Sequence, residues 1–485
     1  MSEKYMKHLL YIVCCCWLAV ACGPSVPDTF TDSDRLPRIY PDYVEVTIPV
    51  NIAPLNFLLR NDAACVYVYI NNVAFYSGRG REVTFDPDDW RTLLTEHVGK
   101  TVEVKVVAKE AEGWKEYRPF SWTIVADQVD PYLTYRLIEP DYEVFSNLVL
   151  QERCVEDFST RNFCDYGLVG NQCMNCHTYA GQDPSTSMFY VRGVDGGAIL
   201  NYNGRLRKLD LRRDDMVSGS VYFGFSPSRR YVVFSTNIII PAFHAESSKR
   251  MEVFDTKSDV YVADLVDNRF IDSPLLADST QLETFPTFSP DGRYIYYCTA
   301  HRLDSLGAIE TQKYSLCRIP FDEATGTIGT EVDTLYNAAI EGKSVCHPRV
   351  SPDGQWLAYT VADYGTFPLW HREADQQLMN LKTRAINPMA QANSPLSDTY
   401  HSWSSNSRWL VFASKRDDGL YGKPYYTYIN KEGVCSKPFV LPQAHPSFYD
   451  NCLKSFNAPE QGTGPLPFSV TDVQKALSSS PTKFR

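Results

Sequence analysis

A turn sequence that recurs in the second half of the chain constrains the fold more than any other feature. Ser-Pro-Asp-Gly occurs at 289–292 and 351–354, and related forms stand at 226–229 and 404–407. The four serines are 53 to 63 residues apart, and each unit places a strand before the turn and an apolar strand after it. A hairpin repeat of this length predicts the blades of a β-propeller with loop insertions.

The first 21 residues are typical of an export signal. Two lysines give a basic start, and the apolar run that follows is too short to span a bilayer. Cys22 comes directly after the small residues 19–21, which resembles the lipobox of bacterial lipoproteins and implies lipidation of Cys22. Cleavage nearby with an unmodified Cys22 is the alternative. Residues 22–38 are rich in Pro, Ser, Thr and Asp and are expected to form a lipoprotein tether.

Residues 39–126 are predicted to form an immunoglobulin-like β-sandwich. Segments 43–50, 65–70 and 101–107 alternate apolar and polar residues with a period of two, as short half-buried strands do. No catalytic constellation stands out in this domain, which favours a spacer or docking module.

The remaining boundaries follow from composition. Residues 127–169 are expected to be a connector with one helix over 147–158, because Leu148, Leu150 and Val155 have roughly helical spacing. The propeller is expected to fill 170–445. Residues 446–485 are rich in Pro and Ser and are expected to form a C-terminal tail.

Residues 173–177 read Cys-Met-Asn-Cys-His, the spacing by which a c-type haem is attached. The thiols of Cys173 and Cys176 would bond the haem vinyl groups, and His177 would ligate the iron. The export signal supports this interpretation, because covalent haem is attached outside the bacterial cytoplasm. Three alternatives stay open: half of a Cys/His zinc site, a thioredoxin-like redox pair, or two unrelated cysteines.

The haem run has the surroundings of a blade. Apolar strands follow it at 188–193 and 198–202, as they follow each Ser-Pro turn. We therefore expect the run near the inner strand of a first blade, close to an end of the central channel. With that blade the repeats give five clear blades, and less regular segments could complete a sixth.

The repeats resemble the WD40-like, TolB-type propeller repeats of bacterial envelope proteins, in which an aromatic residue or Val precedes Ser-Pro-Asp-Gly and a strand follows. With its export signal and its Cys-x-x-Cys-His run, the chain is similar to a group of Bacteroidota envelope lipoproteins. Segments 243–255 and 414–420 share in this resemblance. It implies an all-β propeller that carries a haem segment, in an outer-membrane lipoprotein whose substrate is not established.

A c-type haem used for electron transfer usually takes a second protein ligand, His or Met. His244 is the first candidate, because it lies in the long insertion after a blade hairpin, and loops often carry function. An exposed surface histidine is the alternative. His347 and His401 stand shortly before their blade markers and should approach the central channel, although histidines there often pack structurally. Met188 and Met251 are further candidates.

The net charge of the chain and the motifs described above limit the functions that we expect. A formal net charge of −11 argues against nucleic acid as a partner. We expect a periplasm-facing lipoprotein cytochrome with one covalent haem, which transfers single electrons with an envelope protein and contacts the membrane through the lipid on Cys22. The alternative is a TolB-like propeller scaffold that binds an envelope protein or peptide, with a structural or sensory haem.

A hydrolase is less expected than an electron-transfer or binding protein. Ser220 lacks the strand–turn–helix context of a nucleophile elbow, and the acidic pair at 417–418 is typical of a solvated turn. Eight cysteines outside the signal, Cys22 and the haem run remain for disulfides in an oxidising compartment. Cys154 and Cys164 are the pair nearest to the haem run in sequence.

Overall fold

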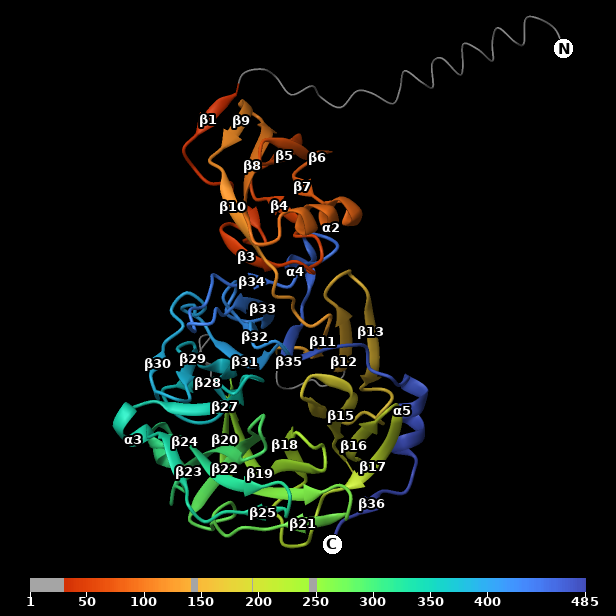
Figure 1. Cartoon of the computed structure of the whole chain (residues 1–485), viewed down its shortest axis with the longest axis vertical. Helices are drawn as coiled ribbons and strands as arrows, with labels where there is room; N and C mark the ends of the chain where they lie inside the picture. Colours follow the sequence, from red (N-terminus) through yellow and green to blue (C-terminus); the bar gives the residue numbers. More distant parts are fainter. Residues whose placement is uncertain (1–29, 141–146, 194, 244–250) are drawn as a thin grey trace, which may run out of the picture.

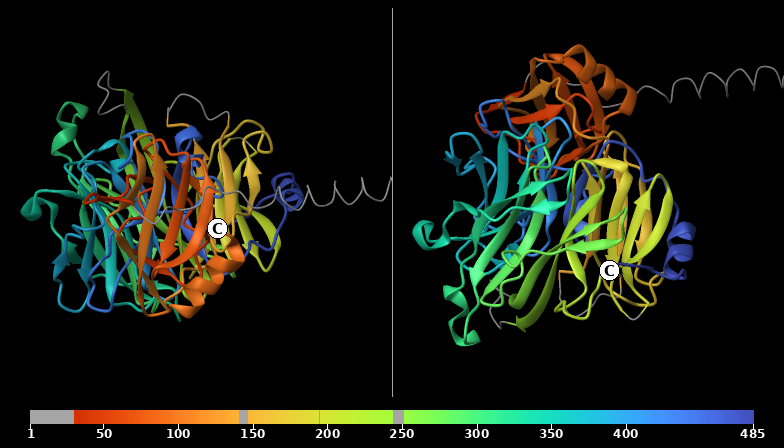
Figure 2. Two further views of the ribbon diagram at one scale, coloured as in Figure 1. Left: turned by 90° about the horizontal axis from the view of Figure 1, so that it is seen from above. Right: turned by 60° about the horizontal axis from the view of Figure 1, so that its bottom comes forward.

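The chain folds into an all-β protein in which an N-terminal sandwich precedes a β-propeller, as the sequence predicts (Figure 1). The computed structural model describes residues 30–140, 147–193, 195–243 and 251–485. The predicted lipidation residue Cys22 and the predicted haem ligand His244 lie outside these ranges. The N-terminal domain lies beside the rim of the propeller, against its first and last blades (Figure 2).

Two sheets and one helix form the N-terminal domain. Val66, Val68 and Ile70 alternate with more exposed residues and face the core, as the period of two predicts. Helix α2 (Pro87–Glu96) begins after Asp86, whose carboxylate accepts hydrogen bonds from two backbone N–H groups of the first turn. The larger sheet contains β1 (Thr31–Ser33), β3 (Val46–Pro49), β5 (Cys65–Ile70), β6 (Val73–Arg79), β8 (Thr101–Glu110), β9 (Gly113–Tyr117) and β10 (Phe120–Val125), and the smaller contains β2 (Ile39–Tyr40), β4 (Phe57–Leu59) and β7 (Glu82–Val83).

Six further sheets in the described residues form the blades, and the first strand named for each blade is the inner one. Blade 1 contains β35 (Ser455–Gly462), β11 (Tyr132–Ile138), β12 (Val149–Cys154) and β13 (Thr160–Asp165). Blade 2 contains β14 (Met174–Ala180), β15 (Asp183–Val191), β16 (Gly197–Tyr202), β17 (Arg205–Asp210) and β36 (Thr482–Lys483). Blade 3 contains β18 (Ser220–Phe225), β19 (Tyr231–Phe243), β20 (Met251–Asp264) and β21 (Arg269–Ile271).

The other three blades follow in chain order. Blade 4 contains β22 (Gln281–Phe288), β23 (Tyr294–His301), β24 (Ser315–Asp322), β25 (Thr327–Ile328) and β26 (Asp333–Tyr336). Blade 5 contains β27 (Ser344–Val350), β28 (Trp356–Ala362), β29 (Asp375–Asn380) and β30 (Ile386–Asn387). Blade 6 contains β31 (Asp398–Trp403), β32 (Trp409–Ser414), β33 (Lys423–Tyr428) and β34 (Phe439–Val440). Short helices in the connections are η1 (Leu306–Thr311), α3 (Ala338–Glu341), η2 (Pro368–Trp370) and α4 (Phe448–Asn451).

The recurring turns close the blade hairpins for a local reason. In each, the serine hydroxyl accepts a hydrogen bond from the backbone N–H five residues later, at 3.0 Å for Ser289 and Tyr294. The residue three positions after the serine is left-handed, which Gly adopts at low cost, and φ is 71° at Gly292. Arg229 and Ser407 adopt the same conformation, with φ of 62° and 63°. The two repeats without glycine at this position therefore form the same turn, although Arg and Ser adopt the left-handed conformation less readily than Gly.

The expectation of a helix over 147–158 is wrong. Residues 149–154 form β12, which pairs with β11 on one side and β13 on the other. Leu148 and Leu150 are two residues apart and both fully buried, which is the period of a strand between two layers. The position of Val155 only imitated a helical spacing.

The expectation of a C-terminal tail at 446–485 is also wrong, because this segment completes two blades. β35 pairs with β11 and supplies the inner strand of blade 1, so the two ends of the propeller close the ring together. Helix α5 (Val470–Leu477), which begins with a capping box between Ser469 and Asp472, packs against blades 1 and 2. β36 then pairs with β17. Such strands have their partners far away in sequence and leave no local repeat signal.

The two domains share one buried core. The indole Nε1 of Trp409 donates to the carbonyl oxygen of Asp127 at 2.7 Å, and Arg60 forms an ion pair with Asp450 at 2.9 Å. Within the described ranges, no helix is long and apolar enough to cross a membrane.

Candidate functional site

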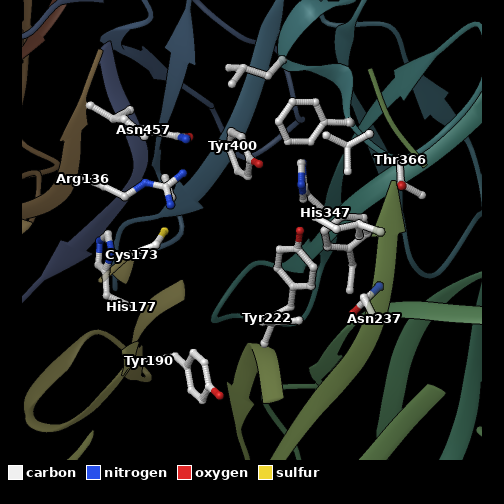
Figure 3. A pocket seen from close by; sticks show the side chains of 18 of the residues that line it. Arg136, Cys173, His177, Tyr190, Tyr222, Asn237, His347, Thr366, Tyr400 and Asn457 are labelled. Carbon is white, nitrogen blue, oxygen red and sulfur yellow. The ribbon is translucent and has the colours of Figure 1, made fainter. Parts of the chain in front are cut away.

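A cavity of about 740 Å³ occupies the centre of the propeller. Residues from the inner strands of all six blades line it (Figure 3). It brings together five residues that the sequence singles out: Cys173, His177, Met251, His347 and His401. In contrast, Met188 is packed in the core between blades 2 and 3.

A β-bulge in each inner strand directs a side chain toward this cavity. Five of the bulges carry a left-handed residue: φ is 55° at Tyr222, 50° at Phe285, 54° at His347, 48° at Tyr400 and 48° at Ala458. All five line the cavity. A bulge adds a residue to one strand and re-aims its side chain, so the same position of each blade faces the channel.

The bulge of blade 2 falls within the Cys-x-x-Cys-His run. The register between β14 and β15 shifts between Asn175 and Thr178, at the position of Cys176 and His177. Cys173, just before β14, and His177 both line the cavity. Figure 3 shows these two side chains close together on one side of it. The side chain of Cys176 is not among those that the structure describes.

His177 has the properties of a neutral metal ligand. It is 7% exposed, and its Nε2 has no hydrogen-bond partner among the described residues. Burial lowers the pKa of His177 to about 4, against the opposite effect of its hydrogen bond to the backbone of Thr134, and Arg136 and Arg349 lower it further. The ring is therefore uncharged at neutral pH, with a hydrogen bond to the backbone of Thr134 and no partner for Nε2 among the described residues.

Aromatic rings from blades 3 to 6 form an arc around the other side of the cavity. The ring centroids are 4.4 Å apart for Tyr222 and Phe285, 4.4 Å for Phe285 and His347, and 4.3 Å for His347 and Tyr400. These distances are typical of direct contact between neighbouring rings. The arc ends at blade 1, where the equivalent residue is Ala458.

His347 and His401 are both buried in this lining. Burial lowers the pKa of His401 to about 3 and the pKa of His347 well below its usual value. Neither ring nitrogen of His347 has a hydrogen-bond partner in the part of the chain that the structure describes. Both imidazoles are thus neutral, and each could ligate a metal held in the cavity.

Cationic side chains outnumber acidic ones in the lining. The cations are Arg136, Arg192, Arg212, Arg349 and Lys415, and the acids are Glu139, Asp255 and Glu460. Glu460 is paired with Arg349 at 2.9 Å. Burial raises the pKa of Asp255 to about 6, although hydrogen bonds from Asn237 and Thr366 oppose this. The cavity therefore favours an anionic occupant over a cationic one.

One wall of the cavity is fixed by a buried histidine. Glu252, on β20 of blade 3, accepts a hydrogen bond from Nε2 of His371 at 2.8 Å, and Glu373 lies 3.0 Å from Nδ1 of the same ring. Burial alone would lower the pKa of His371, but its bonds to Glu252 and Glu373 raise it to about 9. The protonated ring ties blade 3 to the loop after β28, whose residues Phe367 and Trp370 line the cavity.

The described residues also bear on the candidate disulfide between Cys154 and Cys164 and on the alternative of a zinc site. Cys154 and Cys164 are both free thiols, because they do not lie opposite each other on the paired strands β12 and β13. Among the described residues no group of three or more His, Cys, Asp and Glu side chains is arranged to hold a metal ion. A complete protein zinc site is therefore not formed by those residues.

Sequence reasoning missed Arg136 and the aromatic arc. A signal for the arc exists: Tyr222, Phe285, His347 and Tyr400 each stand four residues before the serine of their blade marker. No comparable signal points to Arg136, because blade 1 has no such marker.

Comparisons with known proteins add little to this geometry. No protein-family model and no curated protein matches the chain. An oligogalacturonate lyase in complex with manganese is 14% identical, with 64% of this chain and 73% of that chain covered and a TM-score of 0.35. The periplasmic gluconolactonase of Pseudomonas aeruginosa is 13% identical, with coverage of 64% and 97% and a TM-score of 0.34.

The β-propeller domain of the Trilobed protease from Pyrococcus furiosus is 10% identical, with coverage of 71% and 91% and a TM-score of 0.35. Similarities of this size carry no argument about function. The propeller assignment rests on the strand pairing of the chain itself.

Proposed function

We propose that this protein is a β-propeller of the bacterial cell envelope that holds an electron-transfer ligand in its central cavity. The observation that carries the proposal is the buried, neutral imidazole of His177, a residue of the cavity lining whose Nε2 has no hydrogen-bond partner among the described residues. A buried polar atom without a partner costs free energy, so a bound group that pairs with Nε2 would stabilise the folded protein.

The ligand that these residues fit best is a haem attached to Cys173 and Cys176, with His177 on the iron. Cys173 and His177 share the cavity, and the backbone of Thr134 orients the imidazole as a carbonyl commonly orients a metal-bound histidine. Haem, when bound, supplies one-electron chemistry. His177 would supply a ligand nitrogen, and His347 or His401 would be available as a second ligand. His244 stays a prediction for that position, since it lies outside the described residues.

The predicted location fits this role. Cleavage before Cys22 and lipidation of its thiol would place the propeller at the outer membrane, facing the periplasm. There it would exchange electrons with an envelope redox protein, or bind a structural one. Residues 31–33 of the predicted tether form β1 of the N-terminal sheet, so only the part of the tether before β1 would let the propeller move relative to the membrane surface.

The test is haem attachment in a strain that matures c-type cytochromes. Wild-type protein should keep a haem-staining band on a denaturing gel, and Cys173→Ser or Cys176→Ser should remove most of it. Cys452→Ser is the matched control, because this partly exposed thiol lies outside the cavity lining and should leave staining unchanged. Colourless wild-type protein from such a strain would exclude covalent haem.

A second candidate is a scaffold that binds an envelope protein or peptide, with a structural or sensory haem. The aromatic arc of blades 3 to 6 supports it, because aromatic side chains often anchor binding partners. Redox cycling separates the two. Reversible reduction and reoxidation by an envelope electron donor supports the cytochrome, and a haem that never cycles beside a stably bound envelope protein supports the scaffold.

A further inference from the structure

The channel-facing positions of the six blades are filled unequally. Four hold the contacting rings of the arc, Tyr222, Phe285, His347 and Tyr400, and blade 2 holds its Cys-x-x-Cys-His run. Blade 1 holds Ala458, although its φ of 48° matches that of the aromatic positions. β35 lies between β31 and β14, so Tyr400 and His177 are the neighbours of Ala458 at this level, and the methyl group of Ala458 is smaller than the rings that the other blades place here.

We propose that the cavity binds a planar aromatic anion whose ring system lies over Ala458, between Tyr400 and His177, and whose acidic group pairs with Arg136. This deepens the proposed function, since it assumes that the channel is the ligand site, but it does not require covalent attachment. Neighbouring rings of the arc have centroids 4.3 to 4.4 Å apart. A ligand ring at a similar distance from Tyr400 would extend the arc by one ring.

Arg136 is the residue that we expect to bind the acidic group of the ligand. Its Nη1 donates to the carbonyl oxygen of Met174 at 3.3 Å, and its buried Nε has no hydrogen-bond partner in the described part of the chain. No described acidic side chain forms an ion pair with Arg136, whereas Arg349 is already paired with Glu460. The guanidinium lies close enough to His177 to lower its pKa, and Figure 3 shows it beside Cys173 and His177.

A guanidinium with unused donors suits a carboxylate or phosphate, which it can bind through two parallel N–H groups. A cationic ligand would meet an excess of positive charge in this lining and neutral histidines. An uncharged planar ligand would leave the Nε of Arg136 buried and unpaired.

The test uses the full mature chain, produced in cells that do not attach haem, and metal-free protoporphyrin IX as the probe. Without iron, the porphyrin reports stacking and charge pairing and not ligation by His177. Ala458→Phe should weaken binding at least about tenfold, because the new ring fills the gap, and its backbone conformation is the one that Phe285 already adopts. Arg136→Gln should weaken binding about tenfold or more through the lost charged hydrogen bonds.

Two controls leave the shape of the cavity unchanged: one is a charge-removing variant, and the other is an uncharged form of the probe. Arg302→Gln removes an exposed cation that lies outside the cavity lining and should change the affinity less than threefold. The dimethyl ester of protoporphyrin IX has no charge, so it should bind the wild type more weakly and show no further loss in Arg136→Gln. Flavin mononucleotide is the second probe, since it is a smaller planar anion, and loss of its binding in the same two variants supports the proposal equally.

Equal affinity of the wild type and a folded Ala458→Phe for both probes would overturn the proposal, as would equal affinity for the acid and the ester. Circular dichroism and thermal melting establish that the variants are folded, and the ester comparison holds even if Ala458→Phe does not fold. The outcome is separate from that of the proposed covalent haem. Porphyrin binding with the expected variant pattern, in a chain that never gains a covalent haem, supports this inference and refutes only the attachment.

Discussion

Replacing His371 should remove a pH-dependent part of the propeller's stability. The ordinary pKa of a histidine is 6.5, and the bonds to Glu252 and Glu373 raise that of His371 to about 9 in the folded chain. The folded state therefore binds this proton more tightly than the unfolded state. The stabilisation is fully present below pH 6.5 and is lost as the pH rises through 9.

The size follows from the shift. A change from 6.5 to about 9 corresponds to about 3 kcal/mol of unfolding free energy. The bond to His371 also lowers the pKa of Glu373 to about 2, against the effect of its partial burial. Because both shifts describe one interaction, they are not added.

The assay is urea denaturation followed by tryptophan fluorescence at pH 6 and pH 9.5. Wild-type protein should lose about 3 kcal/mol more between these two conditions than His371→Gln does. His301→Gln is the matched control, because His301 is exposed and its ring bonds only to the neighbouring strand at Gln281. Identical pH dependence of wild type and His371→Gln would show that the ring does not carry this charge in the folded chain.

Three further predictions test the fold and the cavity. Ending the chain at residue 454 removes β35 and should abolish folding of the propeller, which limited proteolysis would show as rapid degradation. Trp409→Ala should lower the unfolding free energy by about 3 to 5 kcal/mol in chemical denaturation, since the indole is fully buried and bonded to Asp127 at the domain junction. Asp255→Asn should raise stability at pH 7 by at most about 3 kcal/mol, because burial raises the pKa of Asp255 to about 6 and the folded wild type loses stability as the pH rises from 4 to 6. The variant should lack that pH dependence in thermal melts.

Blades 3 to 6 could be predicted from sequence because their hairpin signal is local. The serine hydroxyl and the left-handed residue that close each turn lie within a few residues of each other, as at Ser289 and Gly292. Blade 1 could not be predicted, since its inner strand comes from the other end of the propeller. Its strands carry no turn marker, and Leu148 and Val155 imitated the spacing of a helix.

For the cavity, too, the sequence pointed to residues that have a local signal and missed those that do not. The Cys-x-x-Cys-His run could be located from five adjacent residues, although haem attachment to it stays a prediction, and the positions of His347 and His401 before their blade markers point to the channel, where the structure has both. Arg136 could not be found, because it lies on β11 of blade 1, which has no turn marker, and its place in the cavity lining depends on the pairing of β11 with the distant strand β35. The expected roles of Cys22, Cys173, Cys176, His177 and His244 remain predictions.

The measurement that tests the central claim most directly is iron anomalous scattering from crystals of the protein made in a strain that matures c-type cytochromes. The account expects one iron peak inside the propeller cavity, at bonding distance from Nε2 of His177, with density continuous to the sulfurs of Cys173 and Cys176. A cavity without iron in such crystals, with both thiols unmodified, would contradict it.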